Sequence, residues 1–240
     1  MTDANSANPT ATSTNTASNA KLNKLRAAVL GANDGIVSTS SVVMGVAAAT
    51  SSNDAIFTAG MAALVAGALS MAVGEYVSVS SQSDAEKAYV ARERQELAND
   101  PAGELEELSQ AYVALGASQA TARKVAEELT AKDALKAHLH VEFSLVEDDI
   151  SSPTHAAIAS LLSFMAGGLI PFLAIILTPH NLRLQITVAA VLIALVATGY
   201  LSATVGGASR LRAVMRVLVG GSVAMAVTYV VGKLFGAAIL

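Results

Sequence analysis

Residues 55–80, AIFTAGMAALVAGALSMAVGEYVSVS, form a long apolar stretch in which Glu75 is the single charged side chain. A helix needs about 20 apolar residues to cross the roughly 30 Å of bilayer hydrocarbon, so this stretch is long enough to span a membrane. Four more stretches are long and apolar, the first of them the weakest: residues 27–50, 156–178, 184–205 and 213–232. Five such stretches in one short chain indicate a membrane protein rather than a set of helices buried in a soluble core.

The composition of the 240-residue chain supports the same interpretation. Hydrophobic residues make up 53% of it and charged residues 14%, against about 25% charged residues in a typical soluble domain. Because the chain contains no cysteine, disulfides, thiolate zinc sites, iron–sulfur clusters and a cysteine nucleophile are excluded. Copper(I) as the main cargo is disfavoured for the same reason, since soft metals prefer clustered sulfur ligands.

The charged residues are concentrated in one block. Residues 83–150 hold 15 of the 19 Asp and Glu residues and 7 of the 15 Lys and Arg residues, a net charge of −8. The rest of the chain carries a net charge of +4. No sizeable basic face is visible, which argues against nucleic acid as a partner. An acidic module within an apolar chain instead favours cations.

These patterns divide the chain into four parts. Residues 1–20 are rich in Ser, Thr, Asn and Ala, and we expect a disordered tail. Residues 21–82 hold spans one and two, residues 83–150 form an acidic helical domain, and residues 151–240 hold spans three to five. The basic residues outside the block favour a cytoplasmic N-terminus and a cytoplasmic acidic domain; most of them are Lys21, Lys24, Arg26, Arg210, Arg212 and Arg216. The expected fold is therefore all-α, with five spans and a cytoplasmic helical insert between spans two and three.

The acidic block predicts three short helices. Residues 84–98 contain good helix formers, and the run Asp100-Pro101-Ala102-Gly103 interrupts them. Gly116 is expected to end a second helix over 104–115, and Ser118 is a plausible N-cap for a third over 119–149, with a break near 130–133. Three helices with modest apolar faces would form a small bundle.

Carboxylates and one histidine recur at helical spacing within this block. They lie three or four residues apart, on one helix face in each case: Glu93 with Glu96, Glu104 with Glu107, and His138 with Glu142. Oxygen ligands with an imidazole suit divalent ions such as Fe²⁺, Mn²⁺ and Zn²⁺. The alternative is a solvated acidic face in which Arg92 and Arg94 form ordinary ion pairs. His140, His155 and His180 have no carboxylate partner at such a spacing.

Two acidic residues, Asp34 and Glu75, lie inside the expected spans. A carboxylate at the centre of a bilayer costs about 2.5–3.5 kcal/mol on insertion scales, and such residues are normally kept for ion or proton pathways. Met71 precedes Glu75 by one turn and offers a weak thioether ligand. The alternatives are that both carboxylates lie near span ends, in contact with interfacial water, and that Met71 fills space in the core.

Three runs of sequence together resemble the vacuolar iron transporter family: LGANDGIVSTSSVVMGVAAA at 30–49, GALSMAVGEYVSVSSQ at 67–82 and RERQELANDPAGELEEL at 92–108. GGLIPF at 167–172 and the arginine-rich entry to span five also fit. The resemblance covers about residues 21–240. It implies a five-span homodimeric carrier, not an enzyme, that exports Fe²⁺ and often Mn²⁺ from the cytosol in exchange for protons. The ions would pass along the dimer interface, and no permanent cofactor is expected.

The resemblance also assigns residues by position. Asp34 and Met71 match the family's transport path, and Glu75, in the same motif, is assigned a proton role. Five glutamates match the family's metal ligands, Glu93, Glu96, Glu104, Glu107 and Glu142, and His138 is assigned to the same site. This sequence departs from the family at His138, where eukaryotic relatives tend to have Met, and at Leu139, where some have a carboxylate. These departures put metal preference and the size of the ligand shell in question.

Two classes of function follow. The first is a proton-coupled transporter of divalent cations in the bacterial inner membrane, or in the vacuolar membrane if the source is eukaryotic. The second is a membrane-anchored metal buffer or sensor that needs the acidic domain but neither Asp34 nor Met71. Ferroxidase chemistry is disfavoured because the sequence has no Glu-x-x-His pair of the kind used by di-iron bundles.

Overall fold

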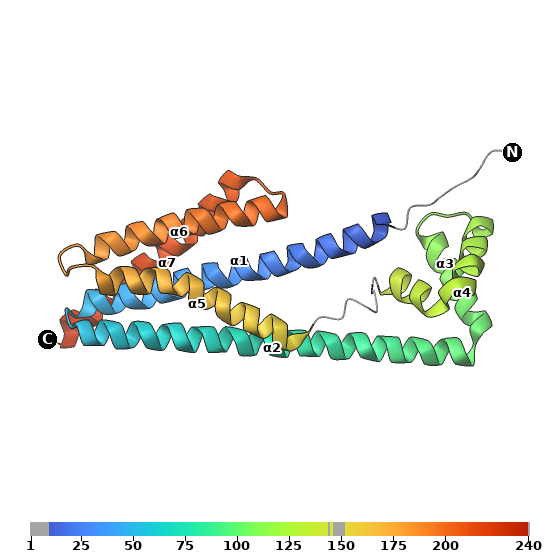
Figure 1. Cartoon of the computed structure of the whole chain (residues 1–240), viewed down its shortest axis with the longest axis horizontal. Helices are drawn as coiled ribbons and strands as arrows, with labels where there is room; N and C mark the ends of the chain where they lie inside the picture. Colours follow the sequence, from blue (N-terminus) through green and yellow to red (C-terminus); the bar gives the residue numbers. More distant parts are fainter. Residues whose placement is uncertain (1–9, 144, 146–151, 240) are drawn as a thin grey trace. The chain divides into compact units, whose positions relative to one another are not determined.

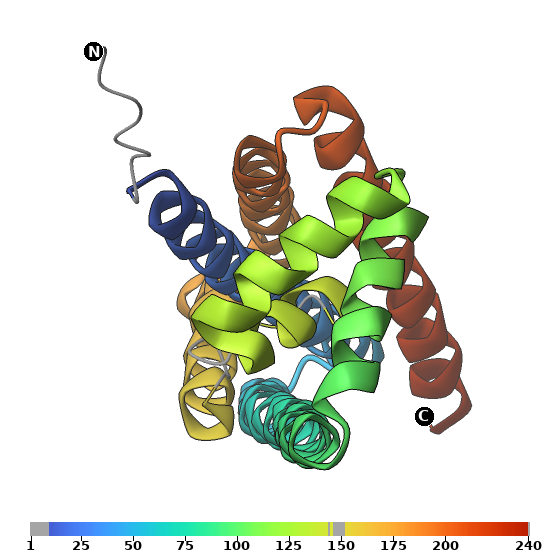
Figure 2. The same ribbon diagram turned by 90° about the vertical axis from the view of Figure 1, so that its right-hand side faces the viewer.

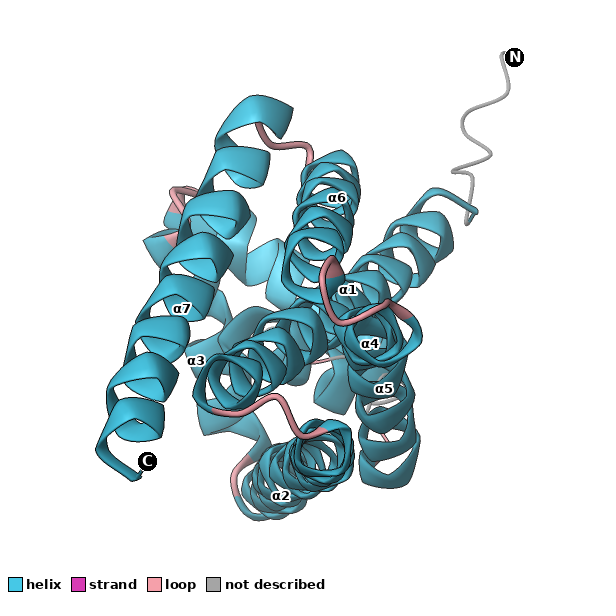
Figure 3. Cartoon of the chain, turned by 90° about the vertical axis from the view of Figure 1, so that its left-hand side faces the viewer, coloured by secondary structure: helices cyan, strands magenta, loops and turns pink. Residues whose placement is uncertain are grey.

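The computed structural model describes residues 10–143, 145 and 152–239, and throughout them the chain consists of helices and loops without strands (Figure 1, Figure 3). This confirms the all-α prediction. Five of the helices are long and apolar enough to cross a membrane. In chain order the helices are α1 (Thr10–Ala49), α2 (Asn53–Asn99), α3 (Pro101–Ala114), α4 (Gln119–Glu142), α5 (Pro153–Leu177), α6 (Arg183–Gly206) and α7 (Arg210–Ile239).

The chain forms two compact units. One, the membrane unit, comprises Met1–Gly74 and Ala157–Leu240, and the other, the acidic unit, comprises Glu75–Ala156. Helix α2 is continuous through the boundary, whereas the sequence pattern suggested a separate helix from residue 84. With 47 residues it is about 70 Å long, more than twice the hydrocarbon thickness. Only its apolar first part can lie in the bilayer, since charged residues follow from Asp84 onward.

Helix α1 begins at Thr10, inside the segment 1–20 for which the sequence favours a disordered tail. Residues 10–30 contain neither Gly nor Pro, and extending an existing helix costs far less than nucleating a new one. These two facts explain why residues 10–20 continue the helix of the first span. Residues 1–9 of the expected tail lie outside the described residues.

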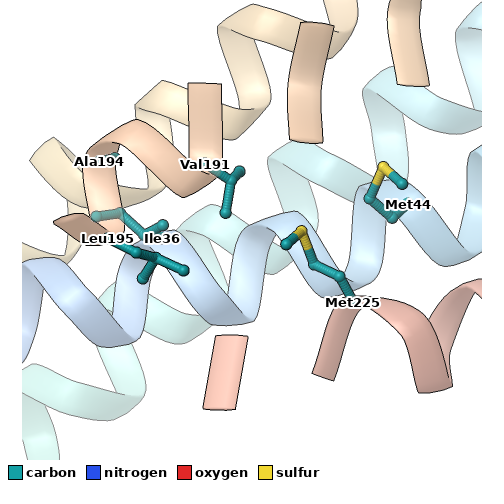
Figure 4. Packing of buried hydrophobic residues seen from close by; sticks show 6 residues of the cluster. All are labelled: Ile36, Met44, Val191, Ala194, Leu195 and Met225. Atoms are coloured by element: carbon teal, nitrogen blue, oxygen red, sulfur yellow. The ribbon is translucent and has the colours of Figure 1, made fainter. Parts of the chain in front are cut away.

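Within the membrane unit, α1 packs against α6 and α7. Figure 4 shows the six buried residues of this core, which are Ile36, Met44, Val191, Ala194, Leu195 and Met225. A second cluster joins α1, α2 and α5 through Val43, Ile56 and Ile175. Large apolar side chains on the outer faces remain exposed, for example Ile193 at 71% and Leu211 at 72%. Such surfaces suit contact with lipid and would be a liability in water.

Helices α1 and α5 cross at glycines. A Cβ atom added at Gly35 would collide with the Phe164 carbonyl oxygen and would lie 2.8 Å from the Gly168 nitrogen. One added at Gly167 would collide with the Ala32 carbonyl oxygen. Both obstacles are backbone atoms, which cannot rotate away. Small residues let helix backbones approach closely in membranes, and this contact places the region around Asp34 against α5.

We expect Gly35→Ala to destabilise the membrane unit by about 1–3 kcal/mol or more, because overpacking forces α1 and α5 apart. The matched control is Gly220→Ala, since a Cβ at Gly220 would meet no atom within 4 Å apart from the adjoining backbone of its own helix. Thermal unfolding of the purified chain in detergent measures the difference. Equal melting temperatures for the two variants would show that the α1–α5 crossing tolerates a wider spacing.

The helices of the acidic unit begin, end or are interrupted close to the breaks predicted from sequence. Asp100 caps α3 by accepting a hydrogen bond from the Gly103 N–H at 2.9 Å, and Ser118 caps α4 through the Thr121 N–H. Gly116 has a φ of 102°, in the left-handed region that favours glycine. Asp133 interrupts α4 with extended backbone angles and accepts a hydrogen bond from the Lys136 N–H.

Helices α3 and α4 pack together in this unit (Figure 2). Their contact buries Leu108, Ala126 and Ala137, with Tyr112 and Leu129 partly buried beside them. Helix α4 ends at Glu142, earlier than the expected 149. Residues 144 and 146–151 lie outside the described part of the chain.

Candidate metal centre

Four of the six predicted ligands meet inside the acidic unit. Glu93 lies near the end of α2, and Glu104 lies in the first turn of α3. The break at Pro101 turns the chain between them and brings the two carboxylates together. His138 and Glu142 follow the interruption of α4 at Asp133, one turn apart on the same face. Three helices thus contribute to one cluster.

The imidazole of His138 is the centre of this cluster. Its Nδ1 atom lies 3.0 Å from Glu93 Oε1, 2.8 Å from Glu142 Oε1 and 3.6 Å from Glu104 Oε2. The side chains of His138 and Glu93 are almost fully buried, with 0% and 2% exposed, while those of Glu104 and Glu142 are 13% and 19% exposed. The cluster is therefore a buried site with its more open side at Glu104 and Glu142.

This arrangement leaves polar atoms without hydrogen-bond partners. One Nδ1–H can satisfy one carboxylate, and the hydrogen bond goes to Glu142. Glu93 Oε1 and His138 Nε2 are buried without a hydrogen bond, which is costly for polar groups in a protein interior. Glu93, Glu104 and His138 can present ligand atoms that all lie within 4.8 Å of one another. A divalent cation fits this donor set because it would neutralise several buried oxygens at once.

The electrostatics of the cluster favour bound cations or protons. Burial, helped by the charge of the nearby Glu142 carboxylate and opposed by His138, raises the pKa of Glu93 to about 7. Burial also raises the pKa of Glu104, helped by Glu107. Ionised carboxylates in this position repel one another and have lost part of their hydration. A bound metal ion would remove both costs.

Glu96 and Glu107 lie at the edge of the cluster. The Glu96 side chain is 38% exposed and pairs with Arg92 Nε at 3.0 Å. For Glu96 this agrees with the alternative interpretation, a solvated acidic face with ordinary ion pairs. Glu107 is exposed. Both still help to raise the pKa of Glu104 through their charge, so they lie near enough to attract a cation. His140, His155 and His180 are exposed and lie outside the cluster.

The predicted transport-path residues Asp34 and Met71 lie in the membrane unit, on α1 and α2. Asp34 is exposed in the single chain and accepts a hydrogen bond from Ser38 Oγ at 2.7 Å. Met71 is half-buried and packs against a buried cluster of Leu64 and Ala68 on α2 and Phe164 on α5. Its Cε lies 3.6 Å from the position of a Cβ at Gly31, three residues before Asp34. Asp34 and Met71 therefore belong to adjacent stretches of α1 and α2.

Glu75 follows Met71 by one turn of α2 and is half-buried. The partner of Asp34, Ser38, was not singled out from sequence as part of the site. Its position one turn after Asp34 is the signal that could have identified it, since a serine four residues after a carboxylate can donate to it.

The raised pKa of Glu93 predicts how the stability of the metal-free protein depends on pH. A group with a raised pKa in the folded protein stabilises the fold at low pH, and this contribution is lost as the pH rises from the ordinary carboxyl range through about 7. We expect the melting temperature of the full chain in detergent with chelator to fall by several degrees between pH 5.5 and pH 8. The fall should be smaller in Glu93→Gln, and an equal fall in both would remove Glu93 as the cause.

Five apolar helices, an in-span carboxylate and a buried carboxylate–imidazole cluster together define a polytopic α-helical membrane protein equipped to handle cations. The profile of the VIT family matches residues 25–233, and the chain belongs to this family. Its members are transporters, which confirms the prediction that the chain is not an enzyme.

Curated relatives support the same assignment. The chain is 46% identical over 211 residues to the "Vacuolar iron transporter" of Acanthamoeba castellanii, a match that covers 88% of this chain and 78% of that protein. It is 40% identical over 213 residues to "Vacuolar iron transporter homolog 1" of Oryza sativa subsp. japonica, covering 88% and 74%. "Vacuolar iron transporter homolog 3" of Arabidopsis thaliana is 39% identical over 213 residues, covering 88% and 83%.

Proposed function

We propose that the chain is a secondary transporter that exports Fe²⁺, and Mn²⁺ or similar divalent ions, from the cytosol in exchange for protons. Its relatives named as iron transporters support iron as the principal cargo. The observation that carries the proposal is the buried cluster of Glu93, Glu104, His138 and Glu142. Its carboxylates and single imidazole match ions of intermediate hardness such as Fe²⁺ and Mn²⁺.

In this proposal the cluster gathers the ion, with Glu96 and Glu107 attracting it at the edge. A carboxyl with a pKa of about 7, such as that of Glu93, holds a proton in part of the molecules at neutral pH. Metal loading would therefore release protons, and acidification would release metal. A lower pH on the far side of the membrane should drive export, because protons compete with the metal for carboxylates.

Asp34, Met71 and Glu75 form the proposed path through the membrane. Asp34 is exposed in the single chain, and an exposed carboxylate facing lipid would cost about 2.5–3.5 kcal/mol on insertion scales. A homodimer whose interface covers Asp34 removes that cost and creates a polar path between two copies. Met71 would contact the ion as a weak thioether ligand, and Glu75 would carry a proton.

The distribution of basic residues supports a cytoplasmic N-terminus. Within the membrane unit, the α1–α2 and α5–α6 links lie at one end, and the α6–α7 link lies at the opposite end (Figure 1). Arg210, Arg212 and Arg216 follow the α6–α7 link, and the positive-inside rule expects the basic end of a membrane protein to face the cytosol. We propose a bacterial inner membrane, or a vacuolar membrane if the source is eukaryotic.

The test is a comparison of ions in proteoliposomes under an imposed pH gradient. Entry of Fe²⁺ and Mn²⁺ should be accompanied by proton movement in the opposite direction, and reversing the gradient should slow it. Co²⁺, Ni²⁺ and Zn²⁺ added one at a time rank the selectivity. Metal entry with no response to the gradient would remove proton coupling from the proposal.

The alternative function is a membrane-anchored metal buffer or sensor. One observation favours it: the four clustered residues all belong to the acidic unit. A buffer would bind metal with normal affinity but leave the ion content of the vesicles unchanged. The exposed in-span carboxylate Asp34 argues for transport, because an anchor has no use for it.

A further inference from the structure

A small polar cavity lies in the membrane unit, at the end that carries the α1–α2 and α5–α6 links. It has a volume of about 210 Å³ and is lined by Asn53, Asp54, Phe57, Ile175, Ile176 and Arg183. Helices α2 and α6 both begin here, at Asn53 and Arg183. Helix N-termini carry partial positive charge and free N–H groups.

Arg183 is the unusual member of this lining. It is only 7% exposed, and its guanidinium carries a permanent charge. Its Nη2 donates a hydrogen bond of 2.5 Å to Asn53 Oδ1, a neutral acceptor, and its Nε–H is buried without a partner. Among the described residues no carboxylate lies within 4.0 Å of its nitrogens. A buried cation without a counter-charge is strongly unfavourable.

Asp54 is the one acidic residue in the lining. It is exposed and lies in the first turn of α2, where a carboxylate is stabilised by the helix dipole without any help from Arg183. The buried positive charge and the unpaired donor therefore call for an acceptor from outside the chain.

From these contacts we infer that the cavity is a binding site for a phosphate-class oxyanion. Arg183 offers a forked guanidinium that suits phosphate oxygens, and the N-termini of α2 and α6, which both begin at the cavity, add partial positive charge. The volume holds several waters, each of about 30 Å³, and is sufficient for one phosphate group. The group could come from a phospholipid headgroup, because the cavity lies at a membrane-proximal end of the spans, or from dissolved phosphate.

The experiment uses the full chain, delipidated in a neutral detergent at constant ionic strength. Thermal unfolding is followed in one arm with inorganic phosphate and in the other with phosphatidylglycerol, with diacylglycerol of the same chains as the lipid control. Saturable stabilisation by phosphate identifies a dissolved anion. Stabilisation by phosphatidylglycerol alone identifies a headgroup. Either result supports the site, and stabilisation by neither overturns it.

Two substitutions locate the binding. Arg183→Gln should weaken it by about tenfold or more, because a charge-assisted bidentate contact is lost. Arg212→Gln, a matched change of an exposed arginine on α7, should leave it unchanged. Asp54→Asn should strengthen it by about threefold, since a repelling carboxylate is removed. This variant decides the question if Arg183→Gln does not fold. Weaker binding in Asp54→Asn, or unchanged binding in folded Arg183→Gln, would overturn the inference.

Discussion

Replacing Asp34 by alanine is expected to reduce metal entry into proteoliposomes to the background of empty vesicles, a loss of at least about 100-fold. The reason is that Asp34 is the only acidic residue of the first candidate span, Ala28–Ala49 of α1. A dehydrated dication in a low-dielectric path requires a negative partner. Initial rates with Fe²⁺ or Mn²⁺ and a fluorescent reporter inside the vesicles measure the effect.

Two variants keep this prediction specific. Asp84→Ala, an exposed acidic position on α2, is the matched control and should transport at the normal rate. Met71→Leu should preserve packing against Leu64, Ala68 and Phe164 but remove the thioether, so flux should fall while the melting temperature stays within a few degrees. Normal flux in both Asp34→Ala and Met71→Leu would eliminate the proposed path.

Glu93→Gln is expected to lower the metal affinity of the acidic unit by at least about 100-fold. It removes a buried carboxylate next to the central His138, one of the proposed metal ligands. The same change should raise the melting temperature of metal-free protein at pH 8, because the native carboxylate is ionised there against a pKa raised to about 7. Calorimetric titration with Mn²⁺ and thermal unfolding with and without metal measure both effects.

A lower metal affinity together with a higher metal-free melting temperature would distinguish a metal ligand from a residue that supports the fold. Glu128→Gln, an exposed carboxyl on α4, is the control and should change neither property. A Glu93→Gln protein that binds Mn²⁺ normally would exclude Glu93 as a ligand. A variant that loses stability without metal would indicate that Glu93 supports the fold instead.

Much of the architecture could be predicted from local sequence. The five spans follow from length and apolarity, and the cap Ser118, like the breaks at Asp100-Pro101 and near Asp133, follows from the chemistry of turn residues. Helical spacing indicated the pairs Glu93 with Glu96, Glu104 with Glu107 and His138 with Glu142, each on one helix face. The resemblance to a known family then indicated that the helices bring them together.

Other features depend on tertiary structure and have no local signal. Glu96 and Glu107 share the spacing of Glu93 and Glu104, yet they lie at the edge of the cluster, because burial is set by how α3 and α4 pack. The start of α1 at Thr10 reflects extension of the first-span helix toward the N-terminus, which residues 10–20 do not signal by themselves. Arg183 looks from sequence like an ordinary link residue, and only the folded chain shows that it is buried and contacts Asn53, 130 positions earlier.

The most direct test of transport is the initial rate of Mn²⁺ entry into proteoliposomes that contain the wild-type chain, compared with protein-free vesicles of the same lipid. The prediction is saturable entry that is faster when the vesicle interior is acidic and that depends on the amount of protein. Mn²⁺ binding to the reconstituted chain with no entry above the protein-free background, at any pH gradient, would contradict it and would favour a metal buffer.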